Sequence, residues 1–453
     1  MTPTTTTDRP LTGRTPTDDG VMAVLEAWLP GRRWFPAKGT EGTVDRVAVV
    51  DLEDPQGQGR VGLHLLRLPS GALLQVPLVL RRDEAGLPEA ARDAVVGRTT
   101  DGTLVVDGPH DPAFVRAWLA AAERPGAAAD AQEADVAGMR VLSGEQSNTS
   151  VLLPALDPPA ILKVFRGVST GPNPDVEVPL GLNEAGWRGA PRPLAWLTGA
   201  WPAAAAGPAE VGHLGVLSEL VQDAQDGFEL ACRHAGQGES FGSLAVDLGR
   251  TTAQMHAALR RALPTGGAAN AEPAAVVAVL RARAAAAVAA APVLAERASA
   301  VEAVLAEVER LPQLPPLQRV HGDYHLGQVL HSADRGWSVL DFEGEPSASE
   351  AERNRPDLAL RDLAGMLRSV DYAAAVGGAP GPGWAQEARE QLVAGYLAEA
   401  GATGAVDATT TAALLRVLEL DKALYEVVYE SRNRPTWVLI PLDGVDRLLV
   451  REG

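Results

Sequence analysis

The sequence predicts an α+β fold with two lobes, in which a β-rich N-terminal part precedes a mainly helical C-terminal part. Short apolar runs separated by turn residues dominate the first half of the chain, and longer helix-like stretches fill the second half. A chain of 453 residues is too long to fold around one hydrophobic core, so two or three subdomains are expected. Hydrophobic and charged fractions of 46% and 22% are those of a globular chain.

The chain begins with a polar segment followed by a small sheet. Residues 1–19 are rich in Thr, Pro and Asp and contain no apolar core, so we expect a disordered tail and not a signal peptide. A short helix is expected near residues 21–29. The runs 44–51, 61–68 and 73–80 have the composition of strands with turns between them. Residues 20–100 are therefore predicted to form a β-rich N-terminal cap.

A second β-rich region is expected at residues 101–222. A helix at 111–123 and a linker rich in Ala, Gly and Asp at 125–135 precede strands at 139–142, 150–153 and 160–165. Asn173 and Pro174 signal the start of another helix, and 214–221 reads as a further strand. We predict an intermediate, nucleotide-binding lobe here.

Residues 223–453 are predicted to form a helical C-terminal lobe. Helices are expected at 227–234, 241–259, 273–311, 358–374, 384–400 and 409–431. A motif-rich region interrupts them between 311 and 358, and it carries the residues with the clearest chemistry.

Charge and composition exclude several classes of partner. The formal charge of −18 argues against nucleic acid or an anionic membrane, since both require a basic surface. The single cysteine, Cys232, excludes an internal disulfide and a Cys-rich zinc site. No run of about 18 apolar residues without charge or proline occurs, so no membrane span is expected. We expect a cytoplasmic monomer that acts on small molecules.

The most informative segment reads HGDYHLGQ and covers residues 321–328. Asp323 lies in this turn, and Asp341 follows eighteen residues later at the end of an apolar run. Kinases that transfer phosphate from ATP to a hydroxyl need one carboxylate beside the acceptor and another to hold magnesium. Asp323 is thus the predicted base, with Asp341 and Gln328 as predicted Mg²⁺ ligands. A zinc site at His321, Asp323 and His325 is a less favoured alternative, because no cysteine lies nearby.

Lys163 is the candidate phosphate-binding cation. It lies within the apolar run 161–165, and Glu177 follows on a predicted helix. Protein-kinase-like folds use such a Lys–Glu pair at the α and β phosphates, although a strand lysine can also simply extend to solvent. The polar loop before this strand could cover the triphosphate, and a plain hairpin turn explains it equally well. The loop residues concerned are Ser143, Gln146, Ser147, Asn148 and Thr149.

The last long helix carries two polar-aromatic stripes. Tyr425 and Tyr429 are four residues apart, and so are Glu426 and Glu430. With Arg432 and Trp437 nearby, these side chains could stack on a sugar ring and bind its hydroxyls. A core helix with surface ion pairs explains the pattern equally well.

Together these segments resemble the actinobacterial maltokinases, which are relatives of the aminoglycoside phosphotransferases. The resemblance covers nearly the whole chain, and HGDxHxxQ at 321–328 and DFEGEP at 341–346 are its most specific motifs. The tail at 421–441 separates this group from more distant sugar and drug kinases. Further matching segments are 28–30, 33–35, 145–150, 173–177, 361–369 and 425–437. The resemblance implies a bilobal protein-kinase-like (aminoglycoside phosphotransferase-like) fold with an N-terminal β-rich cap.

The resemblance also implies the reaction ATP plus maltose giving ADP and maltose 1-phosphate, which feeds glycogen-type α-glucan synthesis from trehalose. It implies that Lys163 and Glu177 hold the phosphates, and that residues 425–437 line the sugar site. Two alternatives remain. One is a kinase of another sugar or amino sugar, such as glucosamine or an aminoglycoside. The other is an inactive nucleotide-binding pseudokinase, which would require a missing base, metal ligand or lysine.

Overall fold

The computed structural model describes residues 11–13, 20–36, 43–125, 134–142, 148–204, 207–265, 271–344, 355–401 and 408–450. The chain divides into two compact units. One comprises Met1–Glu177 and Arg192–Leu220, and the other comprises Val178–Pro191 and Val221–Gly453. The predicted cap and most of the predicted intermediate lobe therefore fall within the first unit.

The first unit contains a largely antiparallel sheet in the order β2-β3-β4-β6-β5, with β10 paired to β4. Its strands are β2 (Asp45–Leu52), β3 (Arg60–Arg67), β4 (Leu73–Arg81), β5 (Val95–Arg98), β6 (Leu104–Asp107) and β10 (Gly167–Val168). Helix α1 (Val21–Trp28) packs against one face through Val21 and Leu25. Helix α3 (Pro112–Ala121) contributes Phe114 and Trp118 to the core on the other face. Since both faces are covered, β3 and β4 are apolar almost throughout.

The second sheet of this unit has the order β1-β11-β12-β9-β8-β7. Its strands are β1 (Leu11–Thr12), β7 (Arg140–Val141), β8 (Asn148–Leu153), β9 (Ala160–Phe165), β11 (Pro193–Trp201) and β12 (Glu210–Glu219). Leu11 pairs with Gly199 and packs against the core. The predicted disordered tail at 1–19 thus includes a short strand. Helix α4 (Pro174–Glu184) follows β10 and begins where Asn173 and Pro174 indicate.

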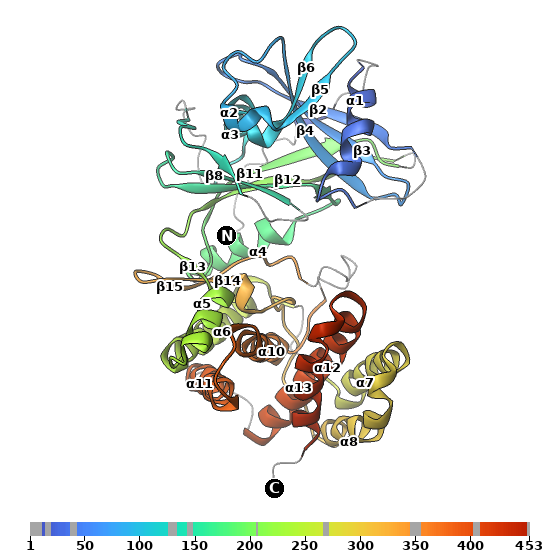
Figure 1. Ribbon diagram of the computed structural model, residues 1–453, viewed down its shortest axis with the longest axis vertical. Helices are drawn as coiled ribbons and strands as arrows, with labels where there is room; N and C mark the ends of the chain where they lie inside the picture. Colours follow the sequence, from blue (N-terminus) through green and yellow to red (C-terminus); the bar gives the residue numbers. More distant parts are fainter. Residues whose placement is uncertain are drawn as a thin grey trace, which may run out of the picture. The chain divides into compact units, whose positions relative to one another are not determined.

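The second unit is mainly helical, as expected (Figure 1). Its main helices are α5 (Gly227–Gln237), α6 (Gly242–Ala262), α7 (Pro273–Ala290), α8 (Ala298–Glu309), α10 (Leu360–Gly377), α11 (Pro382–Gly401), α12 (Ala408–Asn433) and α13 (Leu439–Leu449). The single helix predicted at 273–311 is divided into α7, the short η3 (Pro292–Arg297) and α8. Pro292 has no N–H to continue α7, and Ala291 before it is extended (φ −132°, ψ 93°).

A three-stranded sheet in this unit carries the motif region. It has the order β13-β14-β15, with β13 (Gln225–Asp226), β14 (Val329–Ser332) and β15 (Gly336–Val339). The turn with Asp323 precedes β14 through the short helix η4 (Leu326–Gln328), and Asp341 follows β15. The hairpin thus brings the two predicted chemical segments to the same end of its strands.

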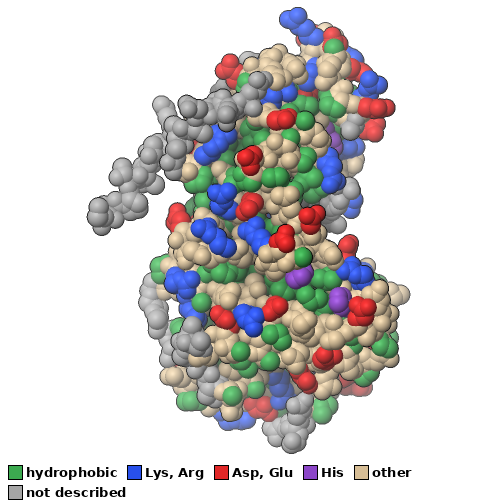
Figure 2. Space-filling model, turned by 90° about the vertical axis from the view of Figure 1, so that its left-hand side faces the viewer, with side chains coloured by type: hydrophobic (Ala, Val, Ile, Leu, Met, Phe, Trp, Pro, Cys, Tyr) green, Lys and Arg blue, Asp and Glu red, His purple; other side chains and the backbone are tan. Residues whose placement is uncertain are grey.

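Helix α7 is the described helix whose length and mean hydropathy of 1.6 would allow a membrane crossing. Val277 and Leu280 on α7 belong to the core of the second unit, and α7 packs against α8 and α12. On the face shown in Figure 2, basic and acidic side chains are interspersed and form no broad area of one sign.

Candidate active site

The imidazole of His321 connects the two aspartate segments. Its Nε2 donates to the backbone oxygen of Leu340 at 2.7 Å, and its Nδ1 accepts from the backbone N–H of Asp323 at 3.4 Å. This arrangement requires the neutral tautomer with the proton on Nε2. One buried ring therefore holds the turn of Asp323 beside the residue that precedes Asp341.

Asp362 on α10 fixes the backbone of the same turn. Its carboxylate accepts from the N–H groups of His321 (2.8 Å) and Gly322 (3.0 Å) and from Nε2 of His256 (3.0 Å). Burial alone would raise the pKa of Asp362. The hydrogen bond and charge of His256, with a smaller contribution from the hydrogen bond of Gly322 N–H, lower that pKa below its ordinary value. Asp362 therefore remains ionised and binds the turn firmly.

Two further residues of α10 shape the turn. Ser369 Oγ accepts from the N–H of Leu326 at 3.0 Å. A Cβ on Gly365 would lie 2.6 Å from the carbonyl oxygen of Tyr324, so only glycine allows this approach. Asp362, Gly365 and Ser369 are three and four residues apart and thus share one helical face. The turn that carries the candidate base Asp323 rests on that face.

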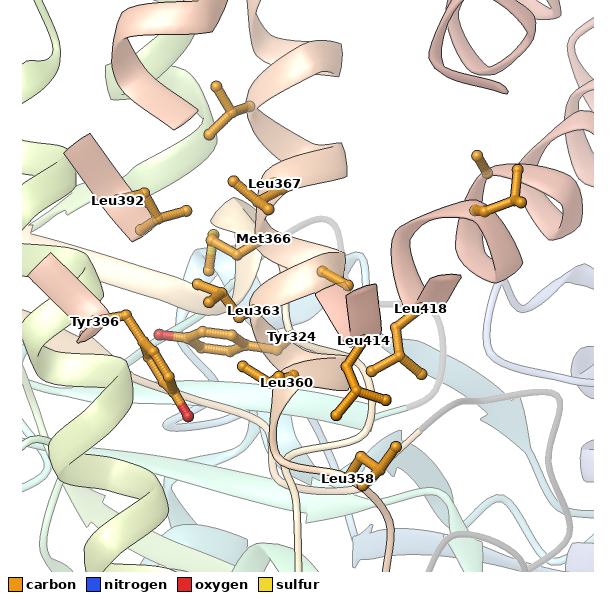
Figure 3. Packing of buried hydrophobic residues seen from close by; sticks show 14 of the residues in the cluster. Tyr324, Leu358, Leu360, Leu363, Met366, Leu367, Leu392, Tyr396, Leu414 and Leu418 are labelled. Carbon is orange, nitrogen blue, oxygen red and sulfur yellow. The ribbon is translucent and has the colours of Figure 1, made fainter. Parts of the chain in front are cut away.

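Tyr324, beside the predicted base, is a core residue. Its side chain lies among Leu360, Leu363 and Met366 (Figure 3). Its hydroxyl lies 3.1 Å from Thr252 Oγ1, and burial raises the pKa of the phenol well above its usual value. The aromatic side chain therefore anchors the turn.

The carboxylate of Asp323 faces two nitrogen-bearing side chains. Its Oδ2 lies 3.8 Å from His325 Nε2, and its Oδ1 lies 3.6 Å from Lys422 Nζ. Burial lowers the pKa of His325 despite the attraction of Asp323, so this ring is neutral near pH 7. Neither contact is within hydrogen-bonding distance, so both carboxylate oxygens can accept a proton from a substrate hydroxyl.

The predicted metal ligands flank one end of the hairpin. The N–H of Leu340 donates to the carbonyl oxygen of Gln328 at 2.9 Å, which places Gln328 opposite the residue before Asp341. Asp341 adopts φ 52°, a left-handed conformation that aspartate tolerates better than most residues and that is frequent at functional sites. A carboxylate and an amide oxygen suit Mg²⁺, which usually takes few protein ligands and keeps water or phosphate oxygens. No cluster of three His, Cys, Asp or Glu side chains with metal-site geometry occurs among the described residues.

Lys163, in the first unit, is paired with a different carboxylate from the one expected. On β9 it lies opposite Ser150 of β8 and Val216 of β12. Its ammonium contacts the carboxylate of Asp175, which is largely buried on the first turn of α4. The side chain of Glu177, two residues later, is exposed. The strand–helix pairing exists, with Asp175 in the position proposed for Glu177.

The polar loop is only partly described. Ser143, Gln146 and Ser147 lie outside the described residues. Asn148 and Thr149 begin β8 and are buried, and Thr149 Oγ1 accepts from Arg166 Nε at 2.9 Å. Arg166 also binds Asp107 at 3.0 Å. The side chain of Thr149 is thus part of the packing of this unit.

A cleft of about 980 Å³ in the second unit reaches the turn of Asp323 at Gly322. Helices α7 and α12 supply most of its wall, and Gly344 and the segment 355–362 complete it. Its charged lining residues are Glu272, Arg283, Arg355, Asp357, Arg361, Asp362, Asp421, Lys422 and Arg432. The cleft is large enough for a sugar beside Asp323.

Arginines neutralise two carboxylates of this cleft, Asp357 and Asp421. Arg361 binds Asp357 at 2.5 Å and Asp421 at 2.8 Å, and Arg283 lies 3.1 Å from the other oxygen of Asp421. The Arg361 guanidinium is buried between these two carboxylates, which raise its pKa against the opposing effect of burial. The lining therefore offers paired groups that can bind hydroxyls.

The structure brings two of the predicted sugar residues to the cleft, Tyr425 and Arg432. Glu426 turns toward α10, where Arg368 binds it at 2.9 Å, and burial raises its pKa. Glu430 is also buried and binds Arg434 at 2.7 Å and the hydroxyl of Tyr372 at 3.1 Å.

The remaining two predicted sugar residues, Tyr429 and Trp437, contact Arg434 instead. Its guanidinium lies 5.5 Å from the Tyr429 ring and 4.4 Å from the Trp437 ring. Neither aromatic side chain lines the cleft. The residues that face it recur every three to four positions along α12, so one helical stripe lines the cleft and another enters ion pairs.

Several site residues were not predicted from the sequence. Asp175 carries no distinctive motif, and the spacing from Lys163 favours the nearby acid Glu177. Asp362 could have been predicted as a site residue from its position between Leu360 and Leu363, since a carboxylate in an apolar part of a helix needs partners when it is buried. Lys422 follows Asp421 in a helix, and nothing in the local pattern indicates its approach to Asp323.

Two segments of the chain match known protein families. Residues 28–111 match the maltokinase N-terminal cap domain, and residues 233–402 match the phosphotransferase enzyme family. The glucosamine kinase of Mycolicibacterium smegmatis is 29% identical over 336 residues, which are 70% of this chain and 80% of that protein. The glucosamine kinase of Streptacidiphilus jiangxiensis is 29% identical over 423 residues, covering 87% and 89%.

Solved structures agree with this grouping. A glucosamine kinase in complex with glucosamine, ADP and inorganic phosphate matches 96% of this chain and 100% of its own, with a TM-score of 0.66 and 26% identity. A second glucosamine kinase structure, crystal form B, gives a TM-score of 0.67 at 25% identity. The predicted protein-kinase-like α+β fold is confirmed, and two segments of the chain are similar to the maltokinase N-terminal cap domain and to the phosphotransferase enzyme family.

Proposed function

We propose that the protein is an ATP-dependent sugar kinase whose acceptor is maltose and whose products are maltose 1-phosphate and ADP. The observation that carries the choice of a neutral sugar is the pairing of Asp357 and Asp421 with arginines in the cleft beside Asp323. A cationic amino sugar would gain most from an unpaired carboxylate, whereas a neutral polyol can bind to ion-paired groups. The cap-domain match and the motifs at 341–346 and 421–441 support the same choice.

In this proposal Asp323 takes the proton of the acceptor hydroxyl while that oxygen attacks the γ-phosphorus of ATP. The bond between the γ-phosphorus and the bridging oxygen breaks, and ADP leaves with its electrons. Gln328 and Asp341 would hold Mg²⁺, which neutralises charge on the phosphates. Lys163, held by Asp175, would bind phosphate oxygens. We expect the enzyme to act as a cytoplasmic monomer and to supply phosphorylated maltose for α-glucan synthesis.

Glucosamine is the second candidate acceptor. The two glucosamine kinases that cover most of this chain favour it, as does the solved structure that contains glucosamine and ADP. The kinase assignment is common to both candidates, so the acceptor is what the experiment must decide.

The test is ADP release with maltose, glucose, glucosamine and kanamycin at matched concentrations, with the product analysed by phosphorus NMR. We expect the highest kcat/KM for maltose and a phosphate on the anomeric carbon. A kcat/KM for glucosamine that exceeds the maltose value tenfold would reject maltose and establish the second candidate. ATP turnover with none of the sugars would reject both.

A further inference from the structure

The use of lysine in this chain is unusually sparse. Of 40 lysines and arginines, only Lys38, Lys163 and Lys422 are lysines. Arginine serves nearly everywhere that a surface or ion pair needs positive charge. An ammonium differs from a guanidinium because it is a compact point charge with freely rotating donors. The presence of a lysine in such a chain therefore indicates a position where that geometry is needed.

Lys422 occupies such a position. Its ammonium lies 3.6 Å from Oδ1 of Asp323 and 5.3 Å from the ring centre of Tyr425. It also lines the cleft proposed for the acceptor. The side chains of Lys422 and Asp323 keep 29% and 19% of their surfaces exposed, so this contact adds little to folding stability. Stability alone does not account for the pair.

The neighbouring residue holds α12 in place. Asp421 binds Arg361 at 2.8 Å and Arg283 at 3.1 Å, which ties this turn of α12 to α10 and α7. Lys422 therefore reaches Asp323 from an anchored backbone. Since burial keeps His325 neutral near pH 7, Lys422 is the permanent positive charge at the carboxylate among the described residues.

We propose that Lys422 is a positioning residue for the catalytic base. Its ammonium holds the Asp323 carboxylate in the orientation that accepts the acceptor proton. It also offsets the negative charge that gathers there when the phosphoryl group approaches. The contact is longer than a hydrogen bond, so the carboxylate oxygens stay available to the substrate hydroxyl. This role rests on the proposed kinase function.

Steady-state kinetics provide the first test. In Lys422→Met we expect kcat to fall by roughly 10²-fold, as for other misplaced catalytic groups, with KM for ATP changed less than about twofold. Lys422→Arg should recover part of kcat because it restores the charge. Arg310→Met is the matched control, since it removes an exposed positive charge of the same unit outside the cleft. An unchanged kcat in Lys422→Met would overturn the proposal, and so would a rise in KM for ATP at constant kcat.

A spectroscopic test does not depend on turnover. Reductive methylation with ¹³C-formaldehyde labels three lysines and the N-terminal amine, and Lys→Arg variants assign the signals. Asp323→Asn should shift the Lys422 signal and leave the Lys163 signal unchanged. An unmoved Lys422 signal would refute the contact. If the signal shifts while no sugar is phosphorylated, the pairing of Lys422 with Asp323 stands and the proposed kinase function fails.

Discussion

At the scale of single residues, hydrogen bonds from histidine side chains hold the backbone around Asp323 in place. His321 uses both ring nitrogens, one toward the N–H of Asp323 and one toward the carbonyl of Leu340. The turn of the proposed base and the segment of the proposed metal ligand are thus connected by one imidazole ring. His325 contributes differently, because its Nδ1 accepts from Gly327 N–H at 3.1 Å and caps η4.

Replacing the proposed base Asp323 should lower the activity without lowering the stability of the fold. In Asp323→Asn we expect kcat to fall by roughly 10²- to 10⁴-fold, the usual contribution of a general base. The melting temperature should change little, because the Asp323 carboxylate accepts no hydrogen bond from described residues. Asp334→Asn, an exposed position in the turn of the same hairpin, is the control. Near-normal turnover in Asp323→Asn would remove Asp323 from the mechanism.

Replacing Asp362 should instead cost stability, and the cost should depend on pH. Its pKa is lowered in the folded state, so its contribution is complete above the unfolded value of about 3.9. The contribution is lost as pH falls through the lower, folded value. In Asp362→Asn we expect a free energy of unfolding reduced by roughly 3 kcal/mol at pH 7. Urea denaturation at pH 7 and pH 3 should show the gap from the parent protein narrowing at the lower pH. An equal gap at both values would contradict this assignment.

At the scale of helices and strands, the periodicity of the sequence predicted the main elements well. The runs at 44–51, 61–68 and 73–80 correspond to β2, β3 and β4, and Ala160–Phe165 is β9 as predicted. Strands β5, β6 and β11 were not predicted. Glycine in β5 and proline, glycine and alanine in β11 weaken the strand pattern, and β6 is a run of only four residues. The division of the 273–311 helix at Pro292 follows from local chemistry and could have been predicted.

The functional faces of helices were harder to predict, because spacing alone does not say which neighbour a face meets. On α12, Tyr425 and Glu426 are adjacent in sequence but serve the cleft and an ion pair with Arg368, respectively. Likewise, the Lys–acid pair joining β9 to α4 was expected, but its register depended on how α4 begins. Such choices depend on contacts between distant segments, which a sequence pattern does not contain.

Helix α10 supplies a test of how closely packing and chemistry are linked. In Gly365→Ala the new Cβ would lie 2.6 Å from the Tyr324 carbonyl oxygen, so the turn that carries Asp323 and Tyr324 must shift. We expect kcat to fall by about 10²-fold, as a displacement near 1 Å typically causes. Gly401→Ala at the end of α11, where a Cβ meets nothing within 4 Å, is the control. It should be neutral or stabilising by up to ~1 kcal/mol. Normal turnover in Gly365→Ala would show that the turn tolerates the shift.

At the scale of the whole molecule, the candidate residues are divided between two units. Lys163 and Asp175 belong to the first, whereas Asp323, Gln328, Asp341 and the cleft belong to the second. Each unit has its own core, so the candidate residues of each unit are supported by the fold around them.

We expect nucleotide binding to raise the stability of the folded protein, and we expect this rise to require Mg²⁺. At 100 times its Kd, ADP with Mg²⁺ should stabilise the folded protein by about 2.7 kcal/mol. This corresponds to a rise of several degrees in melting temperature, measured by differential scanning fluorimetry. EDTA should abolish most of the rise, and Lys163→Met should weaken it. A rise that persists in EDTA would argue against Mg²⁺ at Gln328 and Asp341.

The bridge made by His321 has a consequence for how acceptor preference can change. The spacing between the base and the metal-ligand segment is determined by one ring and one hairpin of the second unit. Most of the wall of the cleft proposed for the acceptor lies elsewhere, on α7 and α12. Substitutions at the cleft positions of α7, and at those of α12 other than Lys422, can therefore change the acceptor while the hydrogen bonds of His321 stay the same. A kinase built this way can acquire a new substrate without rebuilding its chemistry.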